Sequence, residues 1–117
     1  MIKLIKKPWG KEVLFAVTDK YVGKILCINK GARLSLQFHQ FKDETMYVVL
    51  GSAKLTYNNK NRIISVGDSV RIKPGAIHRL EALKDTQIIE VSTPELDDVI
   101  RLEDDYNREI ISKGESK

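Results

Sequence analysis

The sequence predicts an all-β fold, an antiparallel sandwich or barrel, followed by one short helix. The middle of the chain is a series of short apolar segments separated by turn signals at 58–61, 67–68 and 74–75. Asparagine and glycine tolerate left-handed backbone angles and proline ends a strand, so these positions are expected to turn. Many short strands at regular spacing are typical of sandwiches and barrels. The 117 residues fit one domain, so we expect a single domain over 1–117.

The expected strands follow one another from residue 24 to residue 91. Each is either an apolar run rich in β-branched residues or an alternation of apolar and polar residues, and both patterns favour an extended backbone. In chain order they are Lys24–Ile28, Arg33–His39, Thr45–Leu50, Ala53–Tyr57, Arg62–Val66, Ser69–Ile72, His78–Ala82 and Thr86–Val91.

The pattern changes after Pro94. Leu96, Val99 and Ile100 have roughly helical spacing, and the acidic residues among them suit a helix N-terminus. A short C-terminal helix is therefore expected here, followed by a frayed end at 114–117.

Two segments carry the residues of a candidate metal site. Gln37 and His39 are two apart in an expected strand, so their side chains share a face. Glu44 lies just past a polar turn, where a following antiparallel strand could bring it back beside His39. A divalent metal could gather two imidazoles, a carboxylate and an amide oxygen in one pocket. The four candidate ligands are Gln37, His39, Glu44 and His78.

The alternation in Arg33–His39 also predicts an outward apolar stripe. With the polar side chains of this strand toward the pocket, Leu34, Leu36 and Phe38 would point away from it. Such a stripe must be covered by another segment or by another chain. Both covers stay open, and the second would make the protein a homodimer.

Composition argues against several classes of partner. The net charge of +4 comes from scattered basic residues, and no nucleic-acid-binding motif accompanies them, so no nucleic-acid partner is expected. No apolar run is long enough to span a membrane, and the N-terminus lacks the features of a signal peptide. The single cysteine, Cys27, cannot form an internal disulfide, which fits a reducing compartment. We expect a cytoplasmic protein with no membrane partner.

The two metal-site segments resemble the two motifs of the cupin superfamily. The first motif reads Gly, five residues, His-x-His, three or four residues, Glu, six residues, Gly. Its positions are matched by Gly31, His39, Glu44 and Gly51, with Gln37 in place of the first His. The second motif is matched by Gly67, Gly75 and His78, with Lys73 where Pro is usual and Ala82 where Asn is usual. The resemblance implies a double-stranded β-helix, the jelly roll of the cupin barrel.

Further segments are similar to the cupin domain of type II mannose-6-phosphate isomerases. They are Pro8–Gly10, Leu34–Gln37 with His39, His78–Leu80, Ile89–Val91, Asp97–Arg101 and Asp105–Arg108. Thr45-Met46 and Asn107 depart from that family's pattern. The resemblance implies a metal-dependent isomerase that interconverts mannose 6-phosphate and fructose 6-phosphate, and no nucleotidyl transfer by these residues.

The resemblance also implies roles for residues outside the metal site. Arg101 would lie near the substrate, where a guanidinium could stabilise an enediolate or bind phosphate bidentately. Lys24 and Arg79 match family positions and could bind phosphate. Ser35 shares the face of the ligands and could contact a substrate hydroxyl. The base stays open between a metal-held hydroxide and Lys24.

The ligand set does not choose one metal. Zinc is the first expectation, and cobalt, manganese, iron and nickel suit the same donors. Because the amide of Gln37 is neutral, the ion would stay more Lewis-acidic, which favours polarising a sugar oxygen over redox chemistry. Two alternatives stay open: a metal cupin of other chemistry, such as a dioxygenase, and a non-catalytic sugar- or ligand-binding module.

Overall fold

The computed structural model describes residues 2–106 and 108, and all its regular elements are strands. They are β1 (Lys3–Lys7), β2 (Gly10–Val17), β3 (Val22–Ile28), β4 (Leu36–Phe38), β5 (Glu44–Leu50), β6 (Ser52–Tyr57), β7 (Lys60–Ser65), β8 (Ser69–Ile72), β9 (His78–Ala82), β10 (Thr86–Ser92) and β11 (Ile100–Glu103). The eight expected strands are all present, two of them (Ser69–Ile72 and His78–Ala82) with the expected bounds and six with shifted ends. The sequence reasoning did not assign β1, β2 or β11. Within this part of the chain, no helical stretch has the length and apolarity needed to cross a membrane.

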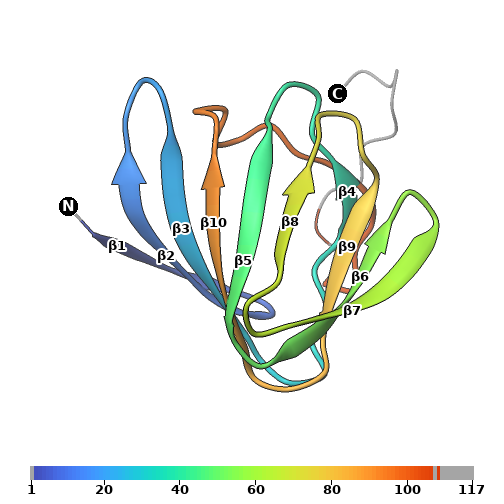
Figure 1. The fold of residues 1–117 in the computed structure, drawn as a ribbon. Coiled ribbons are helices and arrows are strands. Elements are labelled where there is room, and N and C mark those ends of the chain that lie inside the picture. The colour runs from blue at the N-terminus through green and yellow to red at the C-terminus, as the bar shows by residue number, and fades with distance from the viewer. Residues whose placement is uncertain (1, 107, 109–117) are drawn as a thin grey trace.

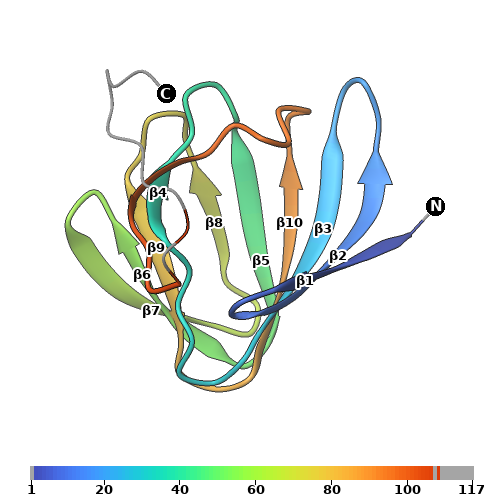
Figure 2. The same ribbon diagram turned by 180° about the vertical axis from the view of Figure 1, so that it is seen from behind.

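The strands form two sheets that face each other (Figures 1 and 2). One sheet has six strands in the order β1-β2-β3-β10-β5-β8, and the other has five in the order β11-β4-β9-β6-β7. All pairs are antiparallel. The chain crosses between the sheets after β3, β4, β5, β7, β8, β9 and β10, which is the winding of a double-stranded β-helix. The predicted all-β jelly roll is confirmed.

The space between the sheets is apolar at one end and polar at the other. Along β3, β5 and β10, the inward positions include one charged residue near one end of the strand, Lys24, Glu44 or Glu90, and mainly apolar residues toward the other end, as in Glu44, Met46 and Val48. The strand register brings the charged residues to the same end of the sheet, since Glu90 pairs with Lys24 of β3 on one side and with Met46 of β5 on the other. The apolar end holds the core, and the polar end is free to form a site. The core cluster consists of Trp9, Leu26, Ile28, Met46, Val48, Ala53, Leu55, Ile64, Ile72, Ala76, Leu80, Ala82 and Ile88.

The predicted C-terminal helix is wrong. Residues 93–99 are irregular, and β11 then pairs with β4. The Asp98 carboxylate accepts hydrogen bonds from three consecutive backbone N–H groups, those of residues 40–42, at 2.7–3.0 Å. Leu96 and Val99 line a cavity between the sheets. A helix of this length would have few internal hydrogen bonds. Hydrogen bonds to β4 and to the loop after it therefore stabilise these residues more than a helix would.

The predicted outward stripe of Leu34, Leu36 and Phe38 is also wrong. Regular pairing in this segment covers only β4, preceded by an isolated bridge from Arg33 to Glu81, so the two-residue alternation does not extend through residues 34 and 35. Leu34 packs against the core, and Phe38 is 7% exposed. Leu34 and Phe38 are covered within the chain and Leu36 is half-buried, so this segment gives no reason to expect a dimer.

Candidate metal centre

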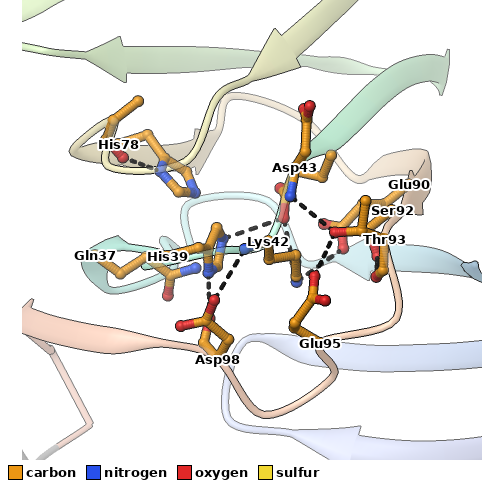
Figure 3. A network of polar contacts seen from close by, with 12 residues as sticks. Gln37, His39, Lys42, Asp43, His78, Glu90, Ser92, Thr93, Glu95 and Asp98 are labelled. Atoms are coloured by element: carbon orange, nitrogen blue, oxygen red, sulfur yellow. Dashed lines mark hydrogen bonds and ion pairs between the residues drawn. The ribbon is translucent and has the colours of Figure 1, made fainter.

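His39, Glu44 and His78 converge at the polar end of the barrel. Glu44 begins β5 in the six-stranded sheet, whereas His39 follows β4 and His78 begins β9 in the other sheet. One potential ligand atom from each lies within 4.8 Å of the other two, and all three side chains are buried. The two imidazole rings are 5.0 Å apart between centroids (Figure 3). Three of the four predicted ligands therefore meet in one place.

Backbone carbonyls set the tautomer of both histidines. His39 Nδ1 lies 2.6 Å from the carbonyl oxygen of Asp98, and His78 Nδ1 lies 2.9 Å from that of Ala76. A carbonyl oxygen only accepts, so each Nδ1 carries a hydrogen, and in the neutral ring the lone pair is therefore on Nε2. Metal-ligating histidines are held in this way.

The donor atoms fit a cation. His39 Nε2 lies 3.1 Å from Glu44 Oε1, yet neither atom has a hydrogen-bond partner with proper geometry in the described chain. The Lys42 ammonium lies 3.2 Å from the same Glu44 oxygen and offsets part of its charge. No group of the described chain donates to the lone pair of His39 Nε2, and a metal ion could fill that place.

The protonation states suit a cation too. Burial raises the pKa of the Glu44 carboxyl, but contact with His39 and the charge of Lys42 outweigh it and hold the pKa at about 2. Burial lowers the pKa of His78. Both shifts favour the forms that ligate metals.

Gln37 lies beside this cluster. It pairs across the strands with His78 on β9 and with Arg101 on β11, so the three residues form a row. Its Oε1 accepts a hydrogen bond of 2.5 Å from the Ser35 hydroxyl, which uses one of the two lone pairs of that oxygen. Ser35 is 1% exposed, so it orients Gln37 from within the protein.

A cavity of about 300 Å³ opens in front of the cluster. Arg101 is half-buried on its wall, and its Nε is buried without a hydrogen-bond partner in the part of the chain that the structure describes. Burial lowers the pKa of Arg101, and the nearby charge of Arg108 adds to this effect. Asp104 holds Arg108 through two contacts of 2.8 and 3.0 Å. The lining residues are Lys7, Trp9, Glu12, Lys24, Leu26, Leu34, Gln37, His39, Lys42, Glu44, Glu90, Leu96, Asp97, Val99, Arg101 and Arg108.

Residues 1–104 match the family model described as "Mannose-6-phosphate isomerase C-terminal". The chain belongs to this family. Mannose-1-phosphate guanylyltransferase ManC of Salmonella typhimurium is 34% identical over 113 residues, which are 92% of this chain and 24% of that protein. The alginate biosynthesis protein AlgA of Pseudomonas aeruginosa is 33% identical over 89% of this chain and 23% of its own length. The chain thus spans about a quarter of the curated relatives it matches.

Solved structures confirm the cupin fold. KdgF from Halomonas has a TM-score of 0.76 and 23% identity, covering 82% of this chain and 89% of its own. An RmlC-like cupin from Shewanella frigidimarina has a TM-score of 0.76 and 18% identity, covering 84% and 88%. The predicted resemblance to the cupin domain of type II mannose-6-phosphate isomerases is confirmed.

The cavity of this cupin also contains a chain of buried ion pairs that sequence reasoning missed. Lys24 Nζ lies 3.3 Å from Glu12 and 4.0 Å from Glu90, and Lys42 Nζ lies 3.6 Å from Glu90 and 3.2 Å from Glu44. Burial raises the pKa of Glu90 to about 7, and the negative charge of Glu44 adds to the effect. Glu90 could have been found from the sequence, because it is a charged residue at an inward position of the otherwise apolar strand β10.

The Arg79 guanidinium contacts groups outside the cluster of His39, Glu44 and His78. Its Nε donates to the carbonyl of Leu34 at 2.9 Å, and its Nη1 lies 3.4 Å from Glu103. The side chain is buried and is not part of the cavity lining described above. These contacts join β9 to the segment before β4 and to β11.

Proposed function

We propose that this cupin binds a divalent transition metal and interconverts an aldose phosphate and a ketose phosphate. Mannose 6-phosphate and fructose 6-phosphate are the first pair to test. The observation that carries the proposal is the convergence of two oriented Nε2 atoms and a carboxylate beside a cavity that His39 and Glu44 line. On the wall of the same cavity, Arg101 has a buried Nε–H that no group of the described chain accepts. The family match supports the same reaction.

His39, Glu44 and His78 would hold the metal, with Gln37 as a neutral fourth donor. Zinc is the first candidate, and cobalt, manganese, iron and nickel accept the same donors. When bound, the ion would supply Lewis-acid polarisation of the sugar oxygens. The groups around these four side chains are buried and mostly charged, and they would keep the donor atoms oriented before a substrate binds.

Arg101 would stabilise the negative charge on the substrate. Aldose–ketose isomerisation moves a proton between two neighbouring carbons, so negative charge develops on the adjoining sugar oxygens. Arg101 faces the same cavity as the ligands, and its orphaned Nε–H can donate to such an oxygen or to a phosphate. Its place in the row with Gln37 and His78 puts it next to the metal donors.

Lys24 would bind the substrate rather than take up its proton. Its ammonium lies between Glu12 and Glu90 on the cavity wall, where it can donate to a sugar hydroxyl or a phosphate oxygen. The names of the curated relatives, mannose-1-phosphate guanylyltransferases, point to phosphorylated sugars as the substrate class. The proposed partner is therefore a phosphosugar.

Two measurements test the proposal. Elemental analysis of protein purified without added metal should find about one transition ion per chain. A coupled assay should then detect conversion of mannose 6-phosphate to fructose 6-phosphate, which a chelator abolishes and zinc or cobalt restores. Metal-loaded protein that neither turns over nor binds a hexose phosphate at millimolar concentration would contradict the isomerase assignment. Binding without turnover would assign the chain to the non-catalytic class, and iron as the native metal would favour the oxygenase class.

A further inference from the structure

The edge strands β7 and β8 lie on either side of a second cavity. The six-stranded sheet ends at β8 and the five-stranded sheet ends at β7 (Figure 1). The cavity between them has a volume of about 400 Å³, against about 300 Å³ for the cavity at the metal centre, and none of the described residues lines both. We call this second cavity the edge cleft. Its volume is in the range that small ligands occupy.

The edge cleft has cations where the apolar core would otherwise continue. Directly paired residues of antiparallel strands project to the same face of the sheet. Arg62 therefore shares the inner face with Leu55, and Lys60 shares it with Tyr57. Ile64, the next inward residue of β7, is fully buried in the core. Two consecutive inward positions of β7 thus carry positive charges toward the space between the sheets.

Protection of the sheet edge does not account for both charges. An inward charge on an edge strand prevents pairing with a further strand, but this role needs one charge and no cavity. Neither Lys60 nor Arg62 has an ion-pair partner in the part of the chain that the structure describes. Arg71 lines the cleft from β8 and is already paired with Asp43 at 2.6 Å. No acidic residue is among the lining residues that the structure describes, so two positive charges are available to an anion.

The remaining walls of the edge cleft are apolar and aromatic. Leu55 comes from one sheet and Val70 from the other, and Tyr57 packs against the core beside them. Sheets packed face to face are about 10 Å apart, so side chains on both walls leave a slot that suits a flat group. Asn61 adds a donor, because its Oδ1 accepts the Thr56 hydroxyl at 2.8 Å and its amide hydrogens remain available.

These features match an anion that carries a flat ring. We propose that the edge cleft binds a nucleotide, with the base against Tyr57 and the phosphate on Lys60 and Arg62. A guanidinium can bind a phosphate bidentately and an ammonium adds a point charge, while a base packs its flat face on aromatic and apolar side chains. A hexose phosphate fits less well, because its hydroxyls would lie without partners against Leu55 and Val70. The inference does not depend on a metal or on the proposed isomerase reaction.

Equilibrium dialysis of the full chain, stripped of metal by a chelator, tests the proposal. GMP should bind with a submillimolar dissociation constant. Ribose 5-phosphate, which lacks the base, and guanosine, which lacks the phosphate, should each bind at least about fivefold more weakly. Because no metal is present, this result does not change if the isomerase assignment fails.

Variants locate the nucleotide. Arg62→Ala and Lys60→Ala should each raise the dissociation constant of GMP at least about 10-fold, and both positions are exposed, so the variants should fold. The matched control is Lys54→Ala, which removes the same charge from β6 at a residue that pairs with Glu81 and does not line the cleft. This control should leave the dissociation constant unchanged. Arg101→Ala should also leave it unchanged, because Arg101 lines the other cavity.

Four results would overturn the proposal. The first is no binding of GMP at millimolar concentration. The second is equal weakening by Lys54→Ala and Arg62→Ala, which would indicate attraction by net charge without a site. The third is weakening by Arg101→Ala and not by Arg62→Ala, which would place the nucleotide at the metal centre. The fourth is binding of a heptaglutamate peptide without binding of GMP, which would assign the edge cleft to an acidic protein segment.

Discussion

Asp98 holds the loop that follows His39, so Asp98→Ala should weaken the metal centre without removing a ligand. The carboxylate accepts the N–H groups of Gln40, Phe41 and Lys42, and the carbonyl of the same residue accepts from His39 Nδ1. The substitution removes three of these four contacts. Hydrogen bonds to a charged group contribute about 1.5–3 kcal/mol each, and water replaces part of this at a partly exposed carboxylate, so we expect a loss of about 2–4 kcal/mol in the free energy of unfolding.

The effect on metal affinity is the decisive part of this prediction. Removal of a group that orients a ligand costs about 10–100-fold in affinity, or roughly 1.4–2.7 kcal/mol. Competition with a chromophoric chelator measures the affinity, and urea unfolding in a chelator measures the stability. Asp19→Ala is the matched control, because this carboxylate has the same charge, is exposed and does not line the cavity. A zinc affinity within about threefold of the unmutated chain, despite lower stability, would refute the orienting role of Asp98.

Three further predictions concern the site. His78→Ala should abolish stoichiometric zinc uptake while circular dichroism still reports a folded barrel, because the apolar core lies at the other end; an unaltered zinc content would contradict the ligand assignment. Arg101→Ala should lower kcat/KM at least about 100-fold at unchanged metal content, and Arg101→Lys should restore little of it. The control Arg62→Ala, at an exposed position, should have no effect. A loss of metal with unchanged turnover per bound ion would show that Arg101 does not take part in the chemistry. Glu90→Gln should stabilise the metal-free protein increasingly as pH rises from about 4.5 to about 7, because over this range folded unmutated protein keeps a proton on Glu90 that the unfolded chain has lost. A difference in urea midpoint between the variant and the unmutated protein that stays constant over this range would contradict the raised pKa of Glu90.

The sequence contained enough to predict the eight strands β3 to β10 and three candidate ligands that the structure brings together. Apolar runs bounded by glycine, asparagine and proline located β3 to β10, and the only two histidines fell at cupin positions. The helix was wrong because the spacing of Leu96, Val99 and Ile100 reflects contact with the cavity and with β4, which no local pattern distinguishes from a helix face. The outward stripe of Leu34, Leu36 and Phe38 was wrong because we assumed that the two-residue alternation continues through residues 34 and 35, which form no regular strand.

The buried ion pairs could not be found by local pattern alone. Lys42 lies in a loop and Glu12 in a strand that was not assigned, so neither had a predicted face. Their contacts join segments that are distant in sequence, and only the register of β2, β3 and β10 brings those segments together. The closing of the two sheets, rather than any short motif, therefore determines the charge pattern of the cavity.

The separation of the barrel into an apolar end and a polar end has an evolutionary consequence. Each of β3, β5 and β10 contributes to folding through one half of its inward residues and to the site through the other half. Substitutions at the polar half can therefore alter which ion or sugar is recognised, while the apolar half continues to hold the sheets together. A scaffold divided in this way can acquire new chemistry in small steps without first losing its fold, which is one physical reason why a single barrel can host unrelated activities.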